Sequence, residues 1–139
     1  MVVDYEPEHF FELAADMPEV ARLVELDPEH ARKLALQAVA RSFRYGDLIV
    51  GIVGMDRKWQ GCGSLWAVFR PEAGAHMLGI TRDCMKLMEE FSERRMEAHV
   101  LDGFMAGHKW MRILGFKPEG LMRKWSPFGE DCWLYARVK

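Results

Sequence analysis

The stretch GHKWMRILGFKPEG (107–120) holds the pattern that decides the fold. An amphipathic helix runs up to Leu114, and Gly115 follows it directly. Glycine in this place takes up the left-handed conformation that satisfies the last carbonyls of a helix, so Gly115 is expected just after the C-cap. Phe116 then begins a strand and packs into the core. The stretch therefore predicts a helix that is followed at once by a buried strand, as in an α/β domain.

The composition limits the class of protein around this stretch. A length of 139 residues fits one domain, 1–139, and a hydrophobic content of 50% supplies a core for it. The formal net charge of −2 gives no electrostatic footprint for nucleic acid or an anionic membrane. No run approaches the ~20 apolar residues of a membrane span, and the N-terminus lacks the pattern of a signal peptide. We expect a cytoplasmic protein with no nucleic-acid or membrane partner.

The cysteines point to a reducing compartment. Cys62, Cys84 and Cys132 are far apart and odd in number, which makes a poor disulfide framework. No CxxC pair or Cys/His cluster suggests zinc, so no metal site is predicted. None of the three has a nearby His or Asp that would mark a nucleophile, and Cys84 lies on the apolar stripe of its helix.

The periodicity predicts the element order β-α-α-β-β-β-α-β-α-β-β. Gly46-Asp47 separates two strand-like runs and suggests a hairpin. The strand of 61–69, the helix after it and the strand of 95–101 form a right-handed crossover candidate, which makes the two strands parallel. The expected helices cover 8–17, 27–42, 76–92 and 104–114, and 19–26 fits either a helix or an extended connection. Helices interleaved with strands predict a mixed α/β sheet.

This order of elements resembles the GNAT superfamily of N-acetyltransferases, which use acetyl-coenzyme A. The closing block 99–138 is similar to the end of that family: a strand, a helix finishing in Leu-Gly-Phe, a strand with an early Glu-Gly, and a last strand. More narrowly, the chain resembles the small GNAT-like proteins encoded by tailed bacteriophages and prophages. The resemblance covers essentially the whole chain and implies a central mixed sheet flanked by about four helices.

The resemblance assigns a binding role to LWAVFRPEAGAH (65–76). The family pattern there is Q/R-x-x-G-x-G/A; Arg70 fits its first position and Ala75 its last, while Ala73 stands where glycine is usual. Backbone N–H groups at a helix start bind pyrophosphate, and small residues allow a close approach. A plain strand-to-helix turn is the alternative. The residues that would bind coenzyme A are Ala67, Val68, Phe69, Arg70, Ala73, Gly74, Ala75, His108 and Met111.

The same comparison weakens the case for chemistry on the helix 104–114. Met111 occupies the place where many relatives carry a Tyr that protonates the leaving thiolate, and Phe104 the place of a helix Asn. His108 lies one turn before Met111 and could act as a polar partner or acid, or simply pack. The strand 64–69 carries no acid for a general base.

Two residues on the strand 95–101 are the nearest candidates for that base. Glu97 and His99 share one strand face by alternation, and an ordinary half-exposed strand face is the favoured alternative. The amine could also attack the thioester directly, with positioning alone as the source of catalysis. Trp59, in a charged, glycine-rich turn, is expected to be exposed, whereas most of the five Trp are expected to pack in the core.

Two functions remain open on the sequence. The first is an acetyl-coenzyme A-dependent N-acetyltransferase, phage- or prophage-encoded, that acts on an unidentified amine. The second is a catalytically degenerate GNAT-fold protein that serves in binding or as a virion-associated structural component. A homodimer is compatible with either, and the location is the host cytoplasm or the virion for a phage protein.

Overall fold

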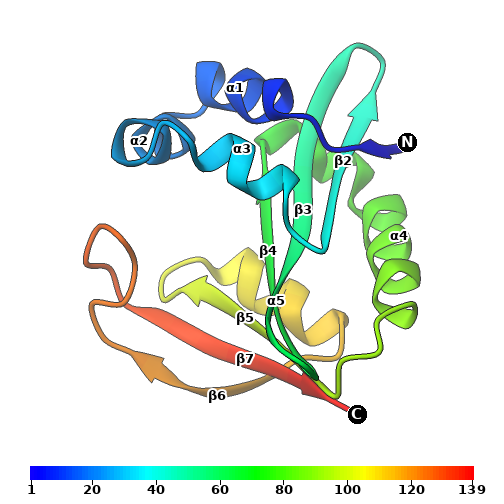
Figure 1. Ribbon diagram of the computed structural model, residues 1–139, viewed down its shortest axis with the longest axis vertical. Coiled ribbons are helices and arrows are strands. Elements are labelled where there is room, and N and C mark those ends of the chain that lie inside the picture. The colour runs from blue at the N-terminus through cyan, green and yellow to red at the C-terminus, as the bar shows by residue number, and fades with distance from the viewer. The chain divides into compact units, whose positions relative to one another are not determined.

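The computed structural model describes residues 1–139 and contains seven strands, five α-helices and one 3₁₀ helix (Figure 1). Hydrogen bonds link the strands in the order β1-β2-β3-β4-β5-β7-β6, a mixed sheet. The elements are β1 (Val2–Asp4), α1 (Pro7–Asp16), α2 (Pro18–Leu26), α3 (His30–Ala35), β2 (Val39–Tyr45), β3 (Leu48–Trp59), β4 (Cys62–Phe69), η1 (Pro71–His76), α4 (Met77–Glu89), β5 (Arg95–Leu101), α5 (Met105–Ile113), β6 (Lys117–Met122) and β7 (Cys132–Val138).

The chain divides into two compact units, which are described separately. Unit 1 contains Met1–Asp56 and Trp66–Lys86, and unit 2 contains Arg57–Leu65 and Leu87–Lys139. Because the division falls within β3, β4 and α4, each of these elements contributes residues to both units. No helix is long and apolar enough to cross a membrane.

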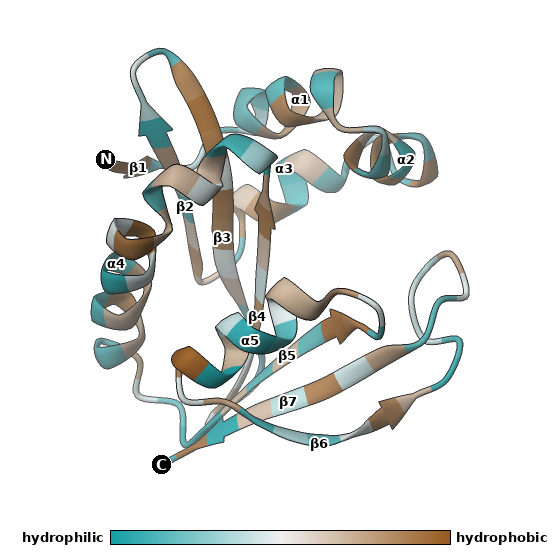
Figure 2. Cartoon of the chain, turned by 180° about the vertical axis from the view of Figure 1, so that it is seen from behind, coloured by the Kyte–Doolittle hydropathy of each residue, from teal (hydrophilic) through white to brown (hydrophobic).

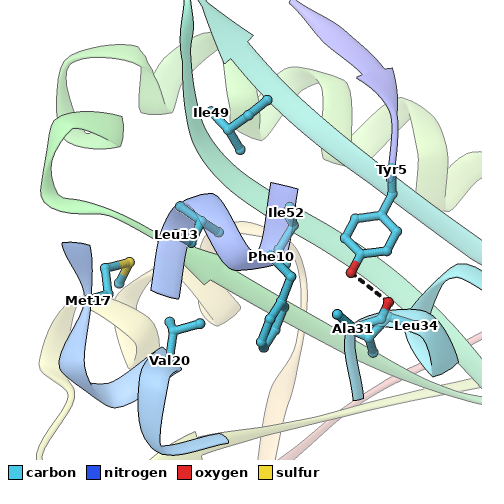
Figure 3. Close-up of a cluster of buried hydrophobic side chains, with 9 residues drawn as sticks. All are labelled: Tyr5, Phe10, Leu13, Met17, Val20, Ala31, Leu34, Ile49 and Ile52. Atoms are coloured by element: carbon cyan, nitrogen blue, oxygen red, sulfur yellow. Dashed lines mark hydrogen bonds between the residues drawn. The ribbon is translucent and has the colours of Figure 1, made fainter. Parts of the chain in front are cut away.

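The core of unit 1 lies between α1–α3 and β3 (Figure 3). The buried hydroxyl of Tyr5 donates a hydrogen bond of 2.8 Å to the Ala31 carbonyl, which ties the end of β1 to α3. The cluster consists of Tyr5, Phe10, Leu13, Met17, Val20, Ala31, Leu34, Ile49 and Ile52. The apolar run of 48–55 is drawn mostly in brown in Figure 2 and supplies the sheet side of this core.

A register shift in β3 explains how two residues three apart reach the same cluster. Phe43 on β2 pairs with Gly51, but the next residue, Arg44, pairs with Ile49. Val50 is therefore an extra residue in β3, and such a bulge changes which side chains face a given side. Ile49 and Ile52 consequently both join the core.

Two glycines in β3 make room for aromatic side chains from β4. A Cβ atom on Gly51 would lie 2.1 Å from Phe69 Cδ1, and one on Gly54 would lie 2.3 Å from Trp66 Cζ2. The Trp66 indole N–H donates to the side-chain carbonyl of Gln37. Because Gly51 and Gly54 have no side chains, the aromatic residues at the end of β4 can lie against β3 within unit 1.

Unit 2 is built on β5, which pairs with β4 in parallel and with β7 in antiparallel orientation. The parallel pairing confirms the parallel relation of these two strands that the sequence predicted. α5 lies on one face of β5 and β7 (Figure 1), where Gly107 lets the helix come close to the Val100 side chain. A Cβ atom on Gly107 would lie 2.9 Å from Val100 Cγ1.

The end of α5 confirms the expectation for Gly115, which has φ +90°. Its N–H bonds the Arg112 carbonyl at 3.1 Å, and the Phe116 N–H bonds the Met111 carbonyl at 2.9 Å. These are the two hydrogen bonds of a Schellman motif. Phe116, buried next to it, closes the helix end on the core.

The predicted hairpin at Gly46-Asp47 is confirmed, because Tyr45 pairs with Leu48 across a two-residue turn. The predicted helix over 27–42 is wrong in its second half. α3 ends at Ala35, and the chain enters β2 at Val39. Residues of β2 pair with β1 on one side and with β3 on the other, so two rows of sheet hydrogen bonds outweigh the local helical pattern. The ambiguous segment 19–26 is helical, as part of α2.

Candidate functional site

The pairing between β4 and β5 is short. It runs from Cys62↔Arg95 to Ser64↔Glu97, three residue pairs, although β5 continues to Leu101. Backbone groups of β5 beyond Glu97 therefore have no β4 ladder partner on that side. In unit 1, Ala67 is exposed and Val68 and Phe69 are half-buried. These are the three residues from which the resemblance predicts backbone contacts to pantetheine.

The segment expected as a glycine-rich loop forms the short 3₁₀ helix η1. Its first residue, Pro71, has no N–H, and the Ala73 N–H is used in a 3.0 Å bond to the Arg70 carbonyl. Ala73 is 1% exposed, whereas Gly74 and Ala75 are exposed. A Cβ atom on Gly74 would meet nothing within 4 Å. Gly74 and Ala75 are therefore the open part of the predicted phosphate segment, and Ala73 belongs to the core.

Arg70 lies beneath this segment. Its Nε donates to the Ile49 carbonyl at 2.7 Å, its Nη1 donates to Asp16 Oδ2 at 2.7 Å, and its backbone N–H donates to the Val50 carbonyl at 2.9 Å. The side chain is 4% exposed, and Nη2 is buried without a hydrogen-bond partner. In this conformation Arg70 holds the start of η1 onto the β3 bulge and α1.

Replacing Arg70 by Met is expected to lower the free energy of unfolding by about 2–4 kcal/mol, because the change removes buried charged hydrogen bonds and leaves the Ile49 carbonyl unpaired. Urea denaturation measures the loss. The control is Asp16→Asn, which removes a charge from a side chain that is 62% exposed and should cost under about 1 kcal/mol. Equal losses in the two variants would contradict the assignment of the stability to the buried bonds.

In unit 2, His108 is held by two neighbours. Its Nε2 lies 2.9 Å from the Asp102 carbonyl, which can only accept, so Nε2 carries a proton. Its Nδ1 lies 2.7 Å from the Tyr135 hydroxyl and, in the neutral ring, accepts a hydrogen bond from that hydroxyl. Both ring nitrogens are thus used inside the buried contact between α5 and β7. Met111 is also buried. The packing alternative describes this histidine better than a free acid.

An open groove lies along α5 in the same unit, lined by Met105, His108, Lys109, Arg112 and Ile113. Its apolar members are exposed at the two ends of the helix, and its two cations lie between them. Met111 does not line the groove. The groove therefore combines apolar surface with two positive charges on one side of the helix.

Glu97 and His99 share the face of β5 opposite α5, because Ala98, between them, pairs with the Tyr135 that bonds His108. Glu97 accepts from Lys58 Nζ at 2.7 Å and from Arg95 Nε at 2.7 Å. The hydrogen bond from Lys58, with help from Arg95, holds the pKa of Glu97 below its ordinary value. A carboxylate bound in this way is a weak base. The structure separates His108 from this face.

His99 differs from both of the other candidates. Its ring stacks on Trp125, with ring centroids 3.9 Å apart and planes 11° apart, and neither ring nitrogen makes a hydrogen bond. Burial, with the nearby Lys58 charge, lowers the pKa of His99. Trp125 is 45% exposed and so is not among the tryptophans that pack in the core; its place in a polar turn beside Pro127 is the signal for exposure. Trp59 is 62% exposed, as expected.

The three cysteines are all free and buried. Burial raises the pKa of the Cys84 thiol to about 12 and also raises that of Cys132. No group of three His, Cys, Asp or Glu side chains is placed to hold a metal ion.

We expect fewer than one thiol per folded chain to react with Ellman's reagent within minutes, because protonated, buried thiols are poor nucleophiles. In the protein unfolded by guanidinium, all three thiols should react. Rapid reaction of one thiol in the folded protein would contradict the buried positions of these side chains.

Comparison with solved structures gives the fold its context. An acetyltransferase of the GNAT family from Streptococcus pneumoniae matches with a TM-score of 0.73 and 19% identity, over 99% of this chain and 98% of that one. A ribosomal-protein-alanine N-acetyltransferase from Brucella melitensis matches with a TM-score of 0.69 and 14% identity, over 100% and 99%. The microcin C7 self-immunity acetyltransferase MccE, in complex with acetyl-CoA and AMP, matches with a TM-score of 0.69 and 14% identity, over 99% and 91%.

Sequence comparisons add no family assignment: no protein-family model and no curated protein matches the chain. The structural matches extend over the whole chain at identities below one in five. The chain has the GNAT acetyltransferase fold.

Proposed function

We propose that the protein is an acetyl-coenzyme A-dependent N-acetyltransferase that acts on an amine. The observation that carries this proposal is the three-pair limit of the β4–β5 ladder within a GNAT fold. It leaves backbone donors and acceptors of β5 free of β4 at the point where relatives of this fold are expected to receive the pantetheine arm. An MccE structure with this fold contains acetyl-CoA, which supports the same ligand here.

Each unit offers chemistry that suits a part of coenzyme A. Gly74, exposed and with open space around its Cα, offers unobstructed backbone for a pyrophosphate. Lys109 and Arg112, in the α5 groove, offer positive charge for phosphates beside an apolar surface. Acetyl-coenzyme A, when bound, supplies the thioester whose C–S bond breaks as the acceptor nitrogen forms a C–N bond.

Transfer in this chain does not depend on a proton donor at the end of α5. Met111 has no proton to give, and both nitrogens of His108 are occupied. Attack by a neutral amine on a thioester needs no covalent enzyme intermediate, so orientation of the two substrates supplies much of the rate. What the chain must still provide is a neutral amine, which requires a base.

A second candidate is a GNAT-fold binding protein without transfer activity, in the phage setting a virion-associated component. Two observations favour it: Met111 in the position of a proton donor, and Arg70 closed in by Ile49 and Asp16 instead of facing an open phosphate site. Either candidate is expected to work without nucleic acid or a membrane.

Calorimetry and mass spectrometry separate the two candidates. Titration with acetyl-CoA should show binding, and incubation with acetyl-CoA should add one acetyl group to an amine probe. Spermidine and a peptide with N-terminal alanine are suitable probes, because structural neighbours are a spermidine N-acetyltransferase from Vibrio cholerae and the alanine acetyltransferase from Brucella melitensis. Binding without transfer would support the second candidate. No binding at high ligand concentration would rule out the enzyme.

A further inference from the structure

We propose that His99 is the base that accepts a proton from the acceptor amine, and that Trp125 is the positioning residue that holds its ring. This inference rests on the proposed function and deepens it. It concerns the face of unit 2 opposite α5, on which Lys58, Arg95, Glu97, His99 and Trp125 lie together.

Unit 2 contains three candidate groups for the base: Glu97, His99 and His108. A base needs an accessible lone pair on an atom that is not already bound. The Glu97 carboxylate is bonded by Lys58 and Arg95, and Arg95 continues to Glu119 at 3.1 Å. His108 uses Nε2 for a carbonyl and Nδ1 for a hydroxyl. Among these three side chains, only that of His99 has its proton-accepting atoms, the two ring nitrogens, free of hydrogen bonds.

The His99 ring is held by stacking on Trp125. The Trp125 indole covers the flat face of the imidazole, at 3.9 Å and 11°. The nitrogens lie at the edge of the ring, so stacking fixes its plane and leaves them free to meet a substrate. The antiparallel partner of His99 on β7 is Leu134, an apolar residue that offers no competing polar group. The stacking therefore orients the ring while its nitrogens stay free of hydrogen bonds.

Trp125 lies in the loop between β6 and β7, and hydrogen bonds hold this loop in shape. Lys124 has φ +53°, a left-handed conformation that costs a non-glycine residue about 1 kcal/mol, and its N–H donates to Asp131 Oδ1 at 2.8 Å. Ser126 Oγ accepts from the N–H groups of Phe128 at 3.2 Å and Glu130 at 3.0 Å. Bonds on both sides of Trp125 thus hold the indole in place.

The charge state of His99 depends on its burial and on the charged groups near it. The groups that act on His99 are Lys58 from β3, a like charge, and Glu97 from β5, whose opposite charge is shared between two cations; the packed residues Leu134 and Trp125 are uncharged. Burial and Lys58 lower the pKa of His99 below its ordinary value, so the ring is neutral at pH 7 and one ring nitrogen carries a free lone pair.

The proton balance is complete with groups already named. An acceptor in the ammonium form gives one proton to His99, and the resulting amine forms the C–N bond as the C–S bond breaks. The second proton lost from nitrogen ends on the thiol of coenzyme A. His99 then releases its proton to solvent and is ready for another cycle. No oxidant, reductant or further reactant is needed.

The test uses the full chain, with spermidine and the N-terminal alanine peptide as acceptors. We expect His99→Gln to lower kcat at pH 7 by about 100-fold or more, with a smaller change in KM. The loss should shrink as pH rises, because the amine then loses its proton in solution. Trp125→Ala should expose the ring and move the acid limb of the kcat/KM profile to higher pH, whereas Trp125→Phe should restore the wild-type limb. Trp59→Ala, a second exposed Trp in unit 2, is the matched control and should leave the profile unchanged.

A readout independent of turnover is the titration of the His99 ring by NMR, assigned with His99→Gln. Its pKa should lie below the ordinary histidine value in the wild type and move upward in Trp125→Ala. A normal or raised pKa in the wild type, or full activity of His99→Gln at pH 7, would overturn this inference and leave the proposed function standing. An unchanged acid limb in Trp125→Ala would overturn the role of Trp125. Absence of any transfer by the wild type would instead overturn the proposed function, and this role with it.

Discussion

Replacing Gly74 by Glu is expected to weaken acetyl-CoA binding by about 100- to 1000-fold. Gly74 is the open position of η1, where the new side chain would meet no protein atom within 4 Å of its Cβ, so the fold should be unaffected. A carboxylate about 4 Å from a pyrophosphate charge costs about 3–4 kcal/mol at an interfacial dielectric constant. Calorimetric titration with acetyl-CoA measures the change.

The matched control is Gly120→Glu, on β6 in unit 2. Gly120 also has nothing within 4 Å of a built Cβ, so the same charge is added to the same fold at a place with no assigned role. Its affinity for acetyl-CoA should match that of the wild type. Equal affinities for all three proteins would show that the pyrophosphate does not lie against η1. Equal weakening in both variants would show a general effect of charge instead of a local one.

Replacing Gly54 by Ala is expected to lower the free energy of unfolding by about 3 kcal/mol. The new Cβ would lie 2.3 Å from Trp66 Cζ2 and 2.6 Å from the Val39 carbonyl oxygen. The indole and the β2 carbonyl would both have to move, and overpacking of this kind forces shifts in the surrounding structure. Urea denaturation followed by fluorescence gives the loss.

Two comparisons isolate the cause. Gly74→Ala adds the same methyl group in open space and should change stability by less than about 0.5 kcal/mol. In the Trp66→Ala background, Gly54→Ala should cost less than it does alone, because the two residues share one space. A loss of the same size in both backgrounds would place the clash at β2 instead of at the indole.

The parts of the fold that could be predicted depend on local chemistry. Gly115 ends α5 because a left-handed residue closes the last turn, and that need is written in the sequence itself. The turn at Gly46 follows the same logic, with φ +62°. The parallel relation of β4 and β5 follows from the intervening helix, which the apolar stripe of α4 marks clearly.

What could not be predicted depends on contacts between distant segments. The stretch 39–42 has helical spacing, yet it pairs with β1 and β3, and no local pattern reveals those partners. Likewise, the family pattern at Arg70 indicates a phosphate ligand, whereas the β3 bulge supplies two carbonyls that hold this residue from below.

The candidate site shows the same division. Alternation correctly put Glu97 and His99 on one face, but it could not show that cations occupy the carboxylate or that Trp125 covers the imidazole. Arg95 lies two residues from Glu97 on β5, but Lys58 comes from β3 and Trp125 from the β6–β7 loop, both far away in the sequence. Similarly, only the fold reveals that Tyr135 and Asp102 engage His108.

The proposed activity is the transfer of an acetyl group from acetyl-CoA to an amine. Its most direct test is mass spectrometry of spermidine and of the N-terminal alanine peptide after incubation with the protein and acetyl-CoA, with matched incubations that lack the protein. We predict that at least one probe gains a single acetyl group in a protein-dependent manner, with release of one equivalent of coenzyme A thiol. Bound acetyl-CoA that stays intact, with neither probe modified above the protein-free rate, would contradict the claim.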